Sequence, residues 1–314
     1  MHSLNATNRA AQQRYSGTEF QAGPRLSDGR KRANSAWSGI VSSSAGETDY
    51  VLGTHDEEVA RLGLQHRVWR DVVTECWQRV GITPGWRVVD VGAGPGYATA
   101  DLAEIVGPTG AVLAVERSGR FLEVARAWCR SRGVANVEFR EADLMEVSLG
   151  DLTYDAAWCR WVANFVSSPP RLVANIAGAL RPGGVVVFHE YSDYATFRFM
   201  PVRPALESFC TEVMASWSAA GGDPNVARDL PQFLVEAGFR VLEIRPRVRT
   251  VSPRDYTWQW PKSFVEINVA RLRELGCVSD TWAADVLREF AAADADPHAW
   301  FTTPMFLEIV AEKK

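Results

Sequence analysis

The sequence predicts an α/β protein built on a mostly parallel, doubly wound sheet. Short apolar strands alternate with helices between Trp86 and Phe188, which is the pattern of a parallel sheet with helices on both faces. The stretch Val88 to Tyr97 reads V-V-D-V-G-A-G-P-G-Y, so three glycines directly follow a buried strand. Such a turn brings free backbone N–H groups close to a ligand.

The bulk composition favours one large soluble domain. The chain has 314 residues, of which 46% are hydrophobic, and no apolar run approaches the roughly 18 residues of a membrane span. The N-terminus is polar and unlike a signal peptide, so we expect a cytoplasmic protein. A net charge of −4 gives no reason to expect a nucleic-acid partner. A small-molecule substrate is the more natural expectation.

The five cysteines are widely spaced and include no C-x-x-C pair. We therefore expect reduced core residues and no metal site. They are Cys76, Cys129, Cys159, Cys210 and Cys277.

The N-terminal segment, residues 1–46, is polar, lacks periodicity and is expected to be a mobile arm. A second interpretation folds Tyr15, Phe20 or Trp37 over a pocket or onto a second subunit, which would make the protein a homodimer. Residues 47–314 form the main domain in either case.

The main domain is expected to begin with an amphipathic helix. Thr54 and Glu57 fit a capping box, apolar residues then recur at helical spacing, and Gly81 ends the pattern. Gly63 divides this helix in two in one interpretation. Strands are predicted at 88–91, 111–115, 137–139, 155–159, 185–188, 241–244 and 306–310. Helices are predicted at 98–106, around Leu122, Ala125 and Cys129 with Gly133 beyond the end, from Pro169 up to Pro182, and in a segment ending at Gly238.

Two segments interrupt the alternation, at about 195–225 and 254–298. Both are predicted to be helical, and both are rich in aromatic residues and methionine. Because they follow strands that end at the ligand edge of the sheet, we expect them to form a lid over the substrate.

The spacing of the glycine turn indicates which nucleotide it binds. A dinucleotide fold requires G-x-G-x-x-G, but here the run is G-x-G-x-G and Tyr97 occupies the position of the third glycine. A nicotinamide oxidoreductase is therefore disfavoured.

At this turn the chain resembles the class I S-adenosylmethionine-dependent methyltransferases. Their first motif is acid-x-Gly-x-Gly-x-Gly, which Asp90, Gly92, Gly94 and Gly96 match. Further matches are Glu116 after the second strand, 141–144 (E-A-D-L) after the third, 154–155 (Y-D) at the fourth, and 180–184 (L-R-P-G-G) before the fifth. The resemblance implies a seven-stranded Rossmann-like sheet ending in an antiparallel hairpin. It also implies S-adenosyl-L-methionine as cofactor and S-adenosyl-L-homocysteine as product.

Carboxylates suit the expected cofactor contacts. Glu116 can accept both ribose hydroxyls, and Asp143 can accept the adenine amine while the Leu144 backbone serves the ring. Asp90 is expected to hold the loop or the cofactor ammonium, and backbone at Cys159 and Arg160 to line the methionine end. The full set of expected cofactor-binding residues is Tyr50, Asp90, Gly92, Gly94, Gly96, Glu116, Arg117, Asp143, Leu144, Cys159 and Arg160.

The end of the fifth strand is expected to carry any general base. His189 and Tyr191 share one face there and Glu190 takes the other, so only one set can meet the substrate. His189 is the natural base for a phenol, hydroxyl or activated carbon, with Tyr191 or Tyr194 orienting the acceptor. The alternative for each is a buried structural role.

The whole chain is similar to small-molecule methyltransferases of the ubiquinone and natural-product type. This similarity implies methyl transfer to an apolar or aromatic acceptor of secondary metabolism. A protein that binds the cofactor without chemistry remains the main alternative.

Overall fold

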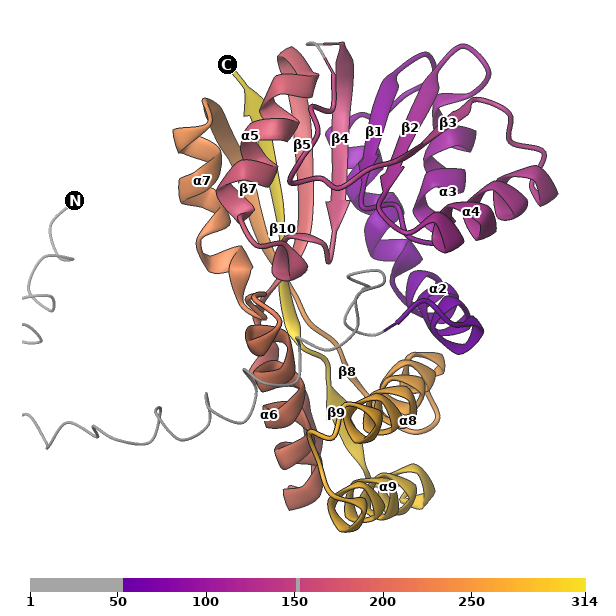
Figure 1. The fold of residues 1–314 in the computed structure, drawn as a ribbon, viewed down its shortest axis with the longest axis vertical. Coiled ribbons are helices and arrows are strands. Elements are labelled where there is room, and N and C mark those ends of the chain that lie inside the picture. The colour runs from indigo at the N-terminus through magenta and orange to yellow at the C-terminus, as the bar shows by residue number, and fades with distance from the viewer. Residues whose placement is uncertain (1–52, 151–152) are drawn as a thin grey trace, which may run out of the picture. The chain divides into compact units, whose positions relative to one another are not determined.

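The computed structural model describes residues 53–150 and 153–314. The predicted arm of residues 1–46 and Tyr50 lie outside the described residues. A seven-stranded sheet carries the fold, in the order β3-β2-β1-β4-β5-β10-β7 (Figure 1). Its strands are β1 (Arg87–Val91), β2 (Ala111–Glu116), β3 (Val137–Glu141), β4 (Tyr154–Arg160), β5 (Leu180–Asp193), β7 (Phe239–Arg247) and β10 (Met305–Lys313).

The sheet is parallel except for β10, which runs antiparallel to both of its neighbours, β5 and β7. The predicted seven-stranded, mostly parallel sheet is thus confirmed. The predicted bounds of the fifth strand were wrong at both ends, because β5 begins at Leu180 and continues past Phe188 to Asp193, pairing with β10 along this extension. In that register, Glu308 of β10 lies opposite His189.

Helices cover both faces of the sheet because successive strand residues point to opposite sides. Val88 packs with α2 and α3 on one face, whereas Val89 packs with α5 and α7 on the other. The helices are α2 (Asp56–Val80), α3 (Tyr97–Val106), α4 (Gly119–Ser131), α5 (Pro169–Ala179) and α7 (Leu230–Glu236). The 3-10 helices are η1 (Ala163–Phe165), η2 (Tyr194–Thr196), η3 (Val226–Arg228) and η4 (Tyr256–Trp258).

Helix α2 is one continuous helix of 25 residues. His55, rather than Thr54, caps it, because the His55 side chain accepts a hydrogen bond from the Glu58 N–H. Gly81 ends the helix in the left-handed conformation, as expected. Gly63 does not divide the helix; a Cβ there would lie 2.9 Å from the Tyr97 ring, so glycine allows Tyr97 to pack closely.

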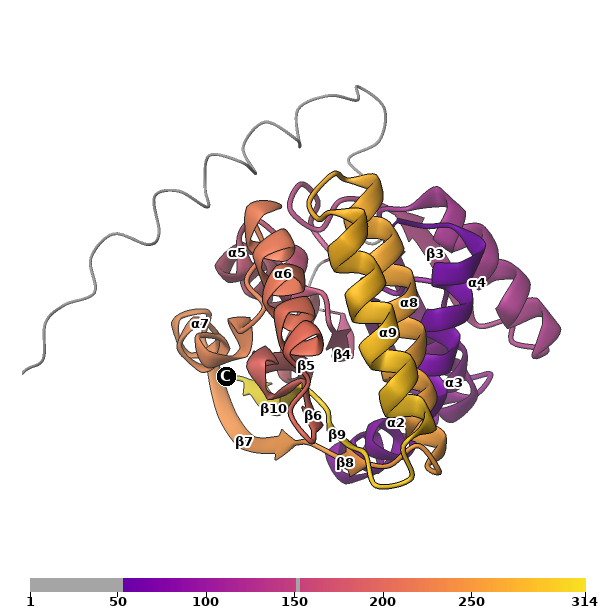
Figure 2. The ribbon, with the colours of Figure 1, turned by 90° about the horizontal axis from the view of Figure 1, so that it is seen from below.

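The two insertions add helices and a second sheet at the carboxyl end of the parallel strands (Figures 1 and 2). Helix α8 packs against α2 and α9, and α6 packs against α9. The second sheet has three short strands, in the order β6-β9-β8. The inserted elements are β6 (Arg198–Met200), α6 (Pro204–Ala219), β8 (Thr250–Val251), α8 (Gln259–Glu274), α9 (Asp280–Ala295) and β9 (Trp300–Thr302).

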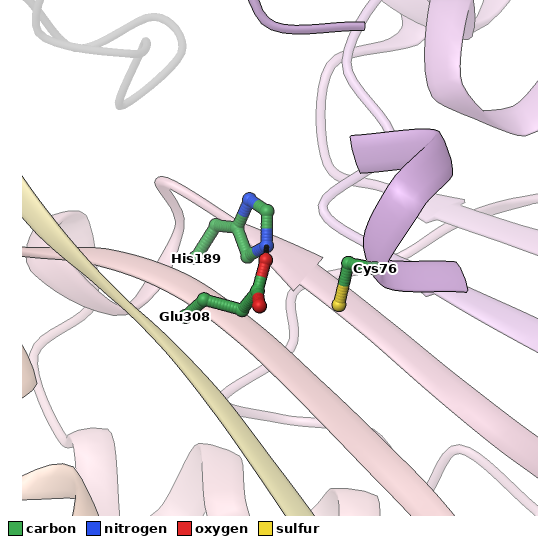
Figure 3. Close-up of side chains that lie close together, drawn as sticks. All are labelled: Cys76, His189 and Glu308. Atoms are coloured by element: carbon green, nitrogen blue, oxygen red, sulfur yellow. Dashed lines mark hydrogen bonds and ion pairs between the residues drawn. The ribbon is translucent and has the colours of Figure 1, made fainter. Parts of the chain in front are cut away.

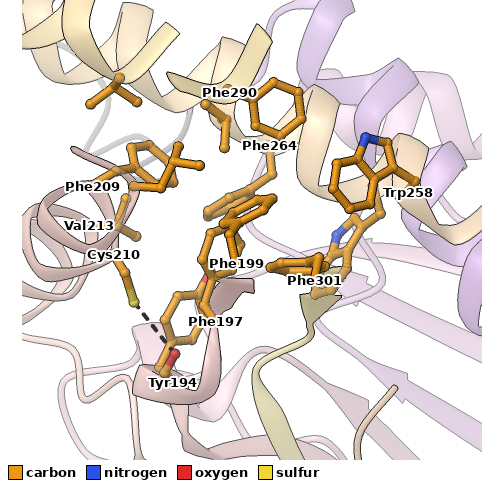
Figure 4. Packing of buried hydrophobic residues seen from close by; sticks show 14 of the residues in the cluster. Tyr194, Phe197, Phe199, Phe209, Cys210, Val213, Trp258, Phe264, Phe290 and Phe301 are labelled. Atoms are coloured by element: carbon orange, nitrogen blue, oxygen red, sulfur yellow. Dashed lines mark hydrogen bonds between the residues drawn. The ribbon is translucent and has the colours of Figure 1, made fainter. Parts of the chain in front are cut away.

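Aromatic side chains of the insertions pack against one another in a core of their own (Figure 4). Phe197 contacts Phe301 with ring centroids 4.7 Å apart, and Phe199 contacts Trp258 at 5.8 Å. Each of these four rings is at most 4% exposed. The aromatic content of the insertions therefore serves mainly to stabilise them.

All five cysteines are unpaired, and four of them are buried. In the described part of the chain, no helix has the combination of length and apolarity that crossing a membrane requires.

Candidate active site

A cavity of about 460 Å³ lies at the carboxyl ends of β1, β2 and β4. Its wall includes the glycine turn, the acids that follow β2 and β3, and the loop that follows β4. The structure thus brings together seven of the predicted cofactor residues: Gly92, Gly94, Glu116, Arg117, Asp143, Leu144 and Arg160.

The three glycines of the turn all have positive φ, but their surroundings differ. A Cβ at Gly92 would lie 2.4 Å from Val162 Cγ2, so the loop after β4 closes directly over this residue. A Cβ at Gly94 would meet no atom within 4 Å, which leaves this backbone open to the cavity. Gly96 begins α3 and packs on Ala125, away from the cavity wall. Gly96 is therefore not part of the cavity lining.

Glu116 and Asp143 fit the adenosine half of S-adenosylmethionine. The Glu116 carboxylate accepts the N–H groups of Gly94 and Ser118, each at 3.0 Å, which fixes its orientation and leaves lone pairs for two hydroxyls. Burial raises the pKa of Glu116. Asp143 Oδ1 accepts the Met145 N–H at 2.7 Å, so Oδ2 remains available for an exocyclic amine. The open glycine turn and the free carboxylate oxygens of Glu116 and Asp143 thus match the hydroxyl and amine groups of a nucleoside.

Asp90, predicted to hold the loop or the cofactor, is 2% exposed and does not line the cavity. It accepts a hydrogen bond from Thr99 Oγ1 at 2.6 Å and so fastens the first turn of α3 to β1. Burial raises the pKa of Asp90 to about 6. Cys159 is also buried behind the wall, with Sγ 3.8 Å from Glu190 Oε1.

The three residues predicted for catalysis lie outside the cavity wall. His189 has no exposed surface, and its Nε2 donates to Glu308 Oε2 at 3.0 Å (Figure 3). The prediction assumed that β5 ended before His189. Because β5 extends to Asp193, this histidine lies within a paired strand, beside β10 and close to Cys76 of α2. Burial lowers its pKa to about 4.

Cys76, His189 and Glu308 form a buried group whose possible ligand atoms lie within 4.8 Å of one another (Figure 3). The chemistry does not fit a metal, because Glu308 already pairs with Arg79 and Arg247. Burial also raises the pKa of the Cys76 thiol, which opposes the thiolate a metal requires. We interpret the group as a hydrogen-bonded part of the core.

Glu190 points to the face of the sheet opposite to that of His189, where it anchors the loop that follows β4. Its Oε1 accepts the N–H groups of Val162 at 2.7 Å and Ala163 at 2.9 Å. The carboxyl group is fully buried, and burial raises its pKa to about 8. Tyr191 is also buried. Its ring stacks on that of Trp161, with centroids 5.5 Å apart; Trp161 lines the cavity and Tyr191 does not. Both residues support the wall.

Trp161 is a cavity residue that the sequence analysis missed. It has φ of 54°, in the left-handed region that non-glycine residues rarely adopt. Its N–H donates to the His189 carbonyl at 2.9 Å, and the Glu190 bonds to the next two residues hold the turn. No sequence signal marks this conformation.

Gln65 of α2 also lines the cavity and was missed. Its Oε1 accepts from Arg61 Nη1 at 2.7 Å and from Trp260 Nε1 at 2.9 Å, while Glu58 binds Arg61 through both carboxylate oxygens. Because both partners of Oε1 are donors, the amide nitrogen is the polar atom left for a ligand. Glu58, Arg61 and Gln65 share one helix face by their 3-4 spacing, a signal that could have revealed them.

Comparison with known sequences supports the cofactor assignment. Residues 89–188 match the family described as Methyltransferase domain. The chain is 28% identical over 189 residues to the ubiquinone/menaquinone biosynthesis C-methyltransferase UbiE of Pseudomonas fluorescens strain SBW25, covering 56% of this chain and 73% of that one. UbiE of Ectopseudomonas mendocina strain ymp is 31% identical over 156 residues, 46% of this chain and 60% of the other.

Solved structures show the same fold. A candidate methyltransferase from Bacillus halodurans C-125 superposes with a TM-score of 0.52 at 20% identity, covering 76% of this chain and 97% of that one. A candidate sarcosine dimethylglycine methyltransferase from Galdieria sulphuraria superposes with a TM-score of 0.52 at 14% identity, covering 90% of this chain and 98% of that one. The family match over residues 89–188 and the shared fold together support a class I S-adenosylmethionine-dependent methyltransferase.

Proposed function

We propose that this enzyme methylates a small, apolar or aromatic, natural-product-like acceptor. The observation that carries the proposal is that one cavity holds both the nucleoside-binding acids and a second, mostly apolar end. That end is lined by Leu62, Trp161, Phe165 and Val166, with Gln65 as a polar contact. One ring-sized acceptor beside a bound cofactor suits this composition.

The bound cofactor supplies a sulfonium-activated methyl group, and the protein supplies alignment. Gly92 and Gly94 let the backbone approach the donor, while Trp161 and Phe165 exclude water from the acceptor end. Among the described residues that line this end, none is a histidine or a carboxylate. The proposal therefore favours an acceptor that is nucleophilic without a protein base, such as a neutral amine, a phenolate or an enolate.

The insertions have a smaller part in this proposal than expected. In the described chain, only Ala220 of the two predicted lid segments lines the cavity. The insertions shape the site by packing α8 against α2 and by placing Trp217 behind Phe165, with ring centroids 4.9 Å apart. Five unpaired cysteines support a reducing, cytoplasmic location.

The cofactor half of the proposal is tested by calorimetry with S-adenosylhomocysteine. Glu116→Ala should weaken binding at least about 10-fold, because it removes an oriented carboxylate that accepts two hydroxyls. Glu123→Ala is the matched control, since Glu123 is an exposed acid on the following helix, α4. Equal affinities in wild type and Glu116→Ala would contradict the assignment.

The acceptor half is tested with methyl-labelled cofactor and a metabolite extract of the host. We expect one labelled small-molecule product, identified by mass spectrometry. Tight cofactor binding without a labelled product, in the extract and across a broad acceptor panel, would instead favour a regulatory protein that binds the cofactor without chemistry.

A further inference from the structure

The Arg160 guanidinium forms part of the cavity wall and is incompletely bonded. Its Nη2 lies 3.1 Å from His66 Nδ1, whereas Nη1 is buried and has no hydrogen-bond partner among the described residues. The group lies over the rings of Trp158 and Trp161, at 5.9 and 5.1 Å from their centroids. A donor in this position is costly to bury without an acceptor.

No acid within the described residues forms an ion pair with Arg160. Of the acids, Asp90 raises the pKa of Arg160 most, but its carboxylate accepts a hydrogen bond from the Thr99 hydroxyl and makes none with Arg160. Asp101 pairs with His66 and Arg70 instead. Burial lowers the pKa of Arg160 to about 10, so the group is still protonated at neutral pH. The cavity wall thus carries a positive charge without a counter-ion.

The neighbours of Arg160 hold it in a fixed orientation. Because arginine can only donate, His66 Nδ1 is the acceptor, and His66 Nε2 donates to Asp101 at 3.0 Å. Asp101 is in turn held by Arg70 Nε at 2.7 Å. Burial lowers the pKa of His66 to about 4, so the imidazole is neutral and does not repel the guanidinium. The site is preorganised for an anion.

We propose that Arg160 binds a carboxylate that enters the cavity as part of a ligand, with Nη1 as its free donor. A buried guanidinium and a carboxylate form a strong, geometrically specific pair. Two ligands of the proposed reaction can supply this group: the methionine end of the cofactor and an acidic acceptor. The inference rests on the proposed function and adds to it the charge of the ligand.

The first experiment compares two nucleosides by calorimetry on wild type and Arg160→Met. S-adenosylhomocysteine carries a carboxylate, whereas 5′-methylthioadenosine has the same thioether nucleoside without the amino-acid part. If the cofactor supplies the carboxylate, Arg160→Met weakens S-adenosylhomocysteine binding about 10- to 100-fold and changes methylthioadenosine binding less than about twofold. Arg130→Met, at an exposed position of α4, is the control for net charge and leaves both affinities unchanged.

The second experiment asks whether the acceptor supplies the carboxylate. Protein saturated with S-adenosylhomocysteine is titrated with benzoate and with uncharged benzamide. If the acceptor is acidic, benzoate raises the melting temperature of wild type but not of Arg160→Met. Benzamide then has no such Arg160-dependent effect, and wild type and Arg160→Met bind the cofactor with equal affinity. If neither cofactor affinity nor the benzoate effect depends on Arg160, the proposal is wrong.

The apoprotein supplies a readout that a merely structural role would not give. Arg160→Met removes a buried charge that has no ion-pair partner, so the melting temperature of the apoprotein should stay equal or rise. A structural arginine would instead lower it. Failure of the proposed function is seen separately, because wild type would then bind no S-adenosylhomocysteine, or would bind it and transfer no methyl group to any acceptor.

Discussion

Replacing Glu190 with glutamine should flatten the pH dependence of stability above about pH 6.5. The carboxyl group is fully buried, and its Oε1 accepts two backbone N–H groups of the loop that follows β4. Glutamine keeps the oxygen acceptor and the shape of the side chain but cannot ionise. It therefore mimics the protonated acid at every pH.

The magnitude follows from the difference between the folded and unfolded pKa values. Burial raises the pKa of Glu190 from 4.5 to about 8, so between these values the folded state holds a proton that the unfolded state has lost. The free energy of unfolding then falls by about 1.4 kcal/mol for each pH unit of increase. Raising the pH from about 6.5 to about 8 should therefore lower the contribution of Glu190 to the free energy of unfolding by roughly 2 kcal/mol.

The comparison with Glu190→Gln isolates Glu190 from the other buried groups. Burial lowers the pKa of His66 and His189 to about 4, whereas in the unfolded chain their pKa of about 6.5 lies at the edge of this range, so both residues make stability rise slightly with pH. Asp90, with a pKa raised to about 6, makes a small contribution of the opposite sign. These contributions are the same in wild type and variant, so the difference between their slopes reports Glu190.

Urea unfolding at the two pH values, followed by tryptophan fluorescence, measures the effect. On going to the higher pH, wild type should lose roughly 2 kcal/mol more of its free energy of unfolding than Glu190→Gln loses. Glu123→Gln, an exposed position, should behave as wild type does. The same slope in wild type and Glu190→Gln would refute the reasoning.

Two further predictions concern the glycine turn and the buried histidine. Gly92→Ala and Gly94→Ala each place an alanine in the left-handed conformation, which should lower the free energy of unfolding by about 1–2 kcal/mol. Only the methyl group at position 92 would also meet Val162, so Gly92→Ala should be the less stable variant. Equal losses of stability in urea titrations would contradict this. His189→Phe should lower the free energy of unfolding by about 1–3 kcal/mol, because Glu308 loses a buried donor, while turnover per folded molecule stays within about threefold. A stable variant with turnover reduced over a hundredfold would restore His189 as the base.

The cofactor half of the site could be predicted because its chemistry is encoded locally. Gly92 and Gly94 follow a buried strand, and Glu116 and Asp143 each follow the next strand along the chain. Parallel strands bring their carboxyl ends to one edge, so these four residues had to meet. All four line the cavity.

The expected position of His189 at a strand end was wrong because strand length depends on distant partners. Polar residues after Phe188 looked like a strand end, but pairing with β10 extends β5 through them. Glu308, 119 residues later, then supplies the partner of His189. No local pattern at His189 indicates such a partner.

The insertions show a different limit. Rings such as Phe197 and Trp258 suit a substrate box and an internal core equally well, since both require large apolar side chains. Only the packing of α6, α8 and α9 shows that these rings contact one another. The strands β6, β8 and β9 span two or three residues each, too few for alternation to appear in a sequence.

The left-handed Trp161 has a consequence for altering substrate preference by engineering. A smaller side chain at this position would keep the left-handed backbone but lose the stacking on Tyr191 that offsets its strain. A larger acceptor would then gain room at the expense of a displaced loop over Gly92. Leu62 and Ala220 border the same cavity from helical segments without such strain. A library intended to broaden the acceptor range should therefore begin at these two positions and keep Trp161 fixed.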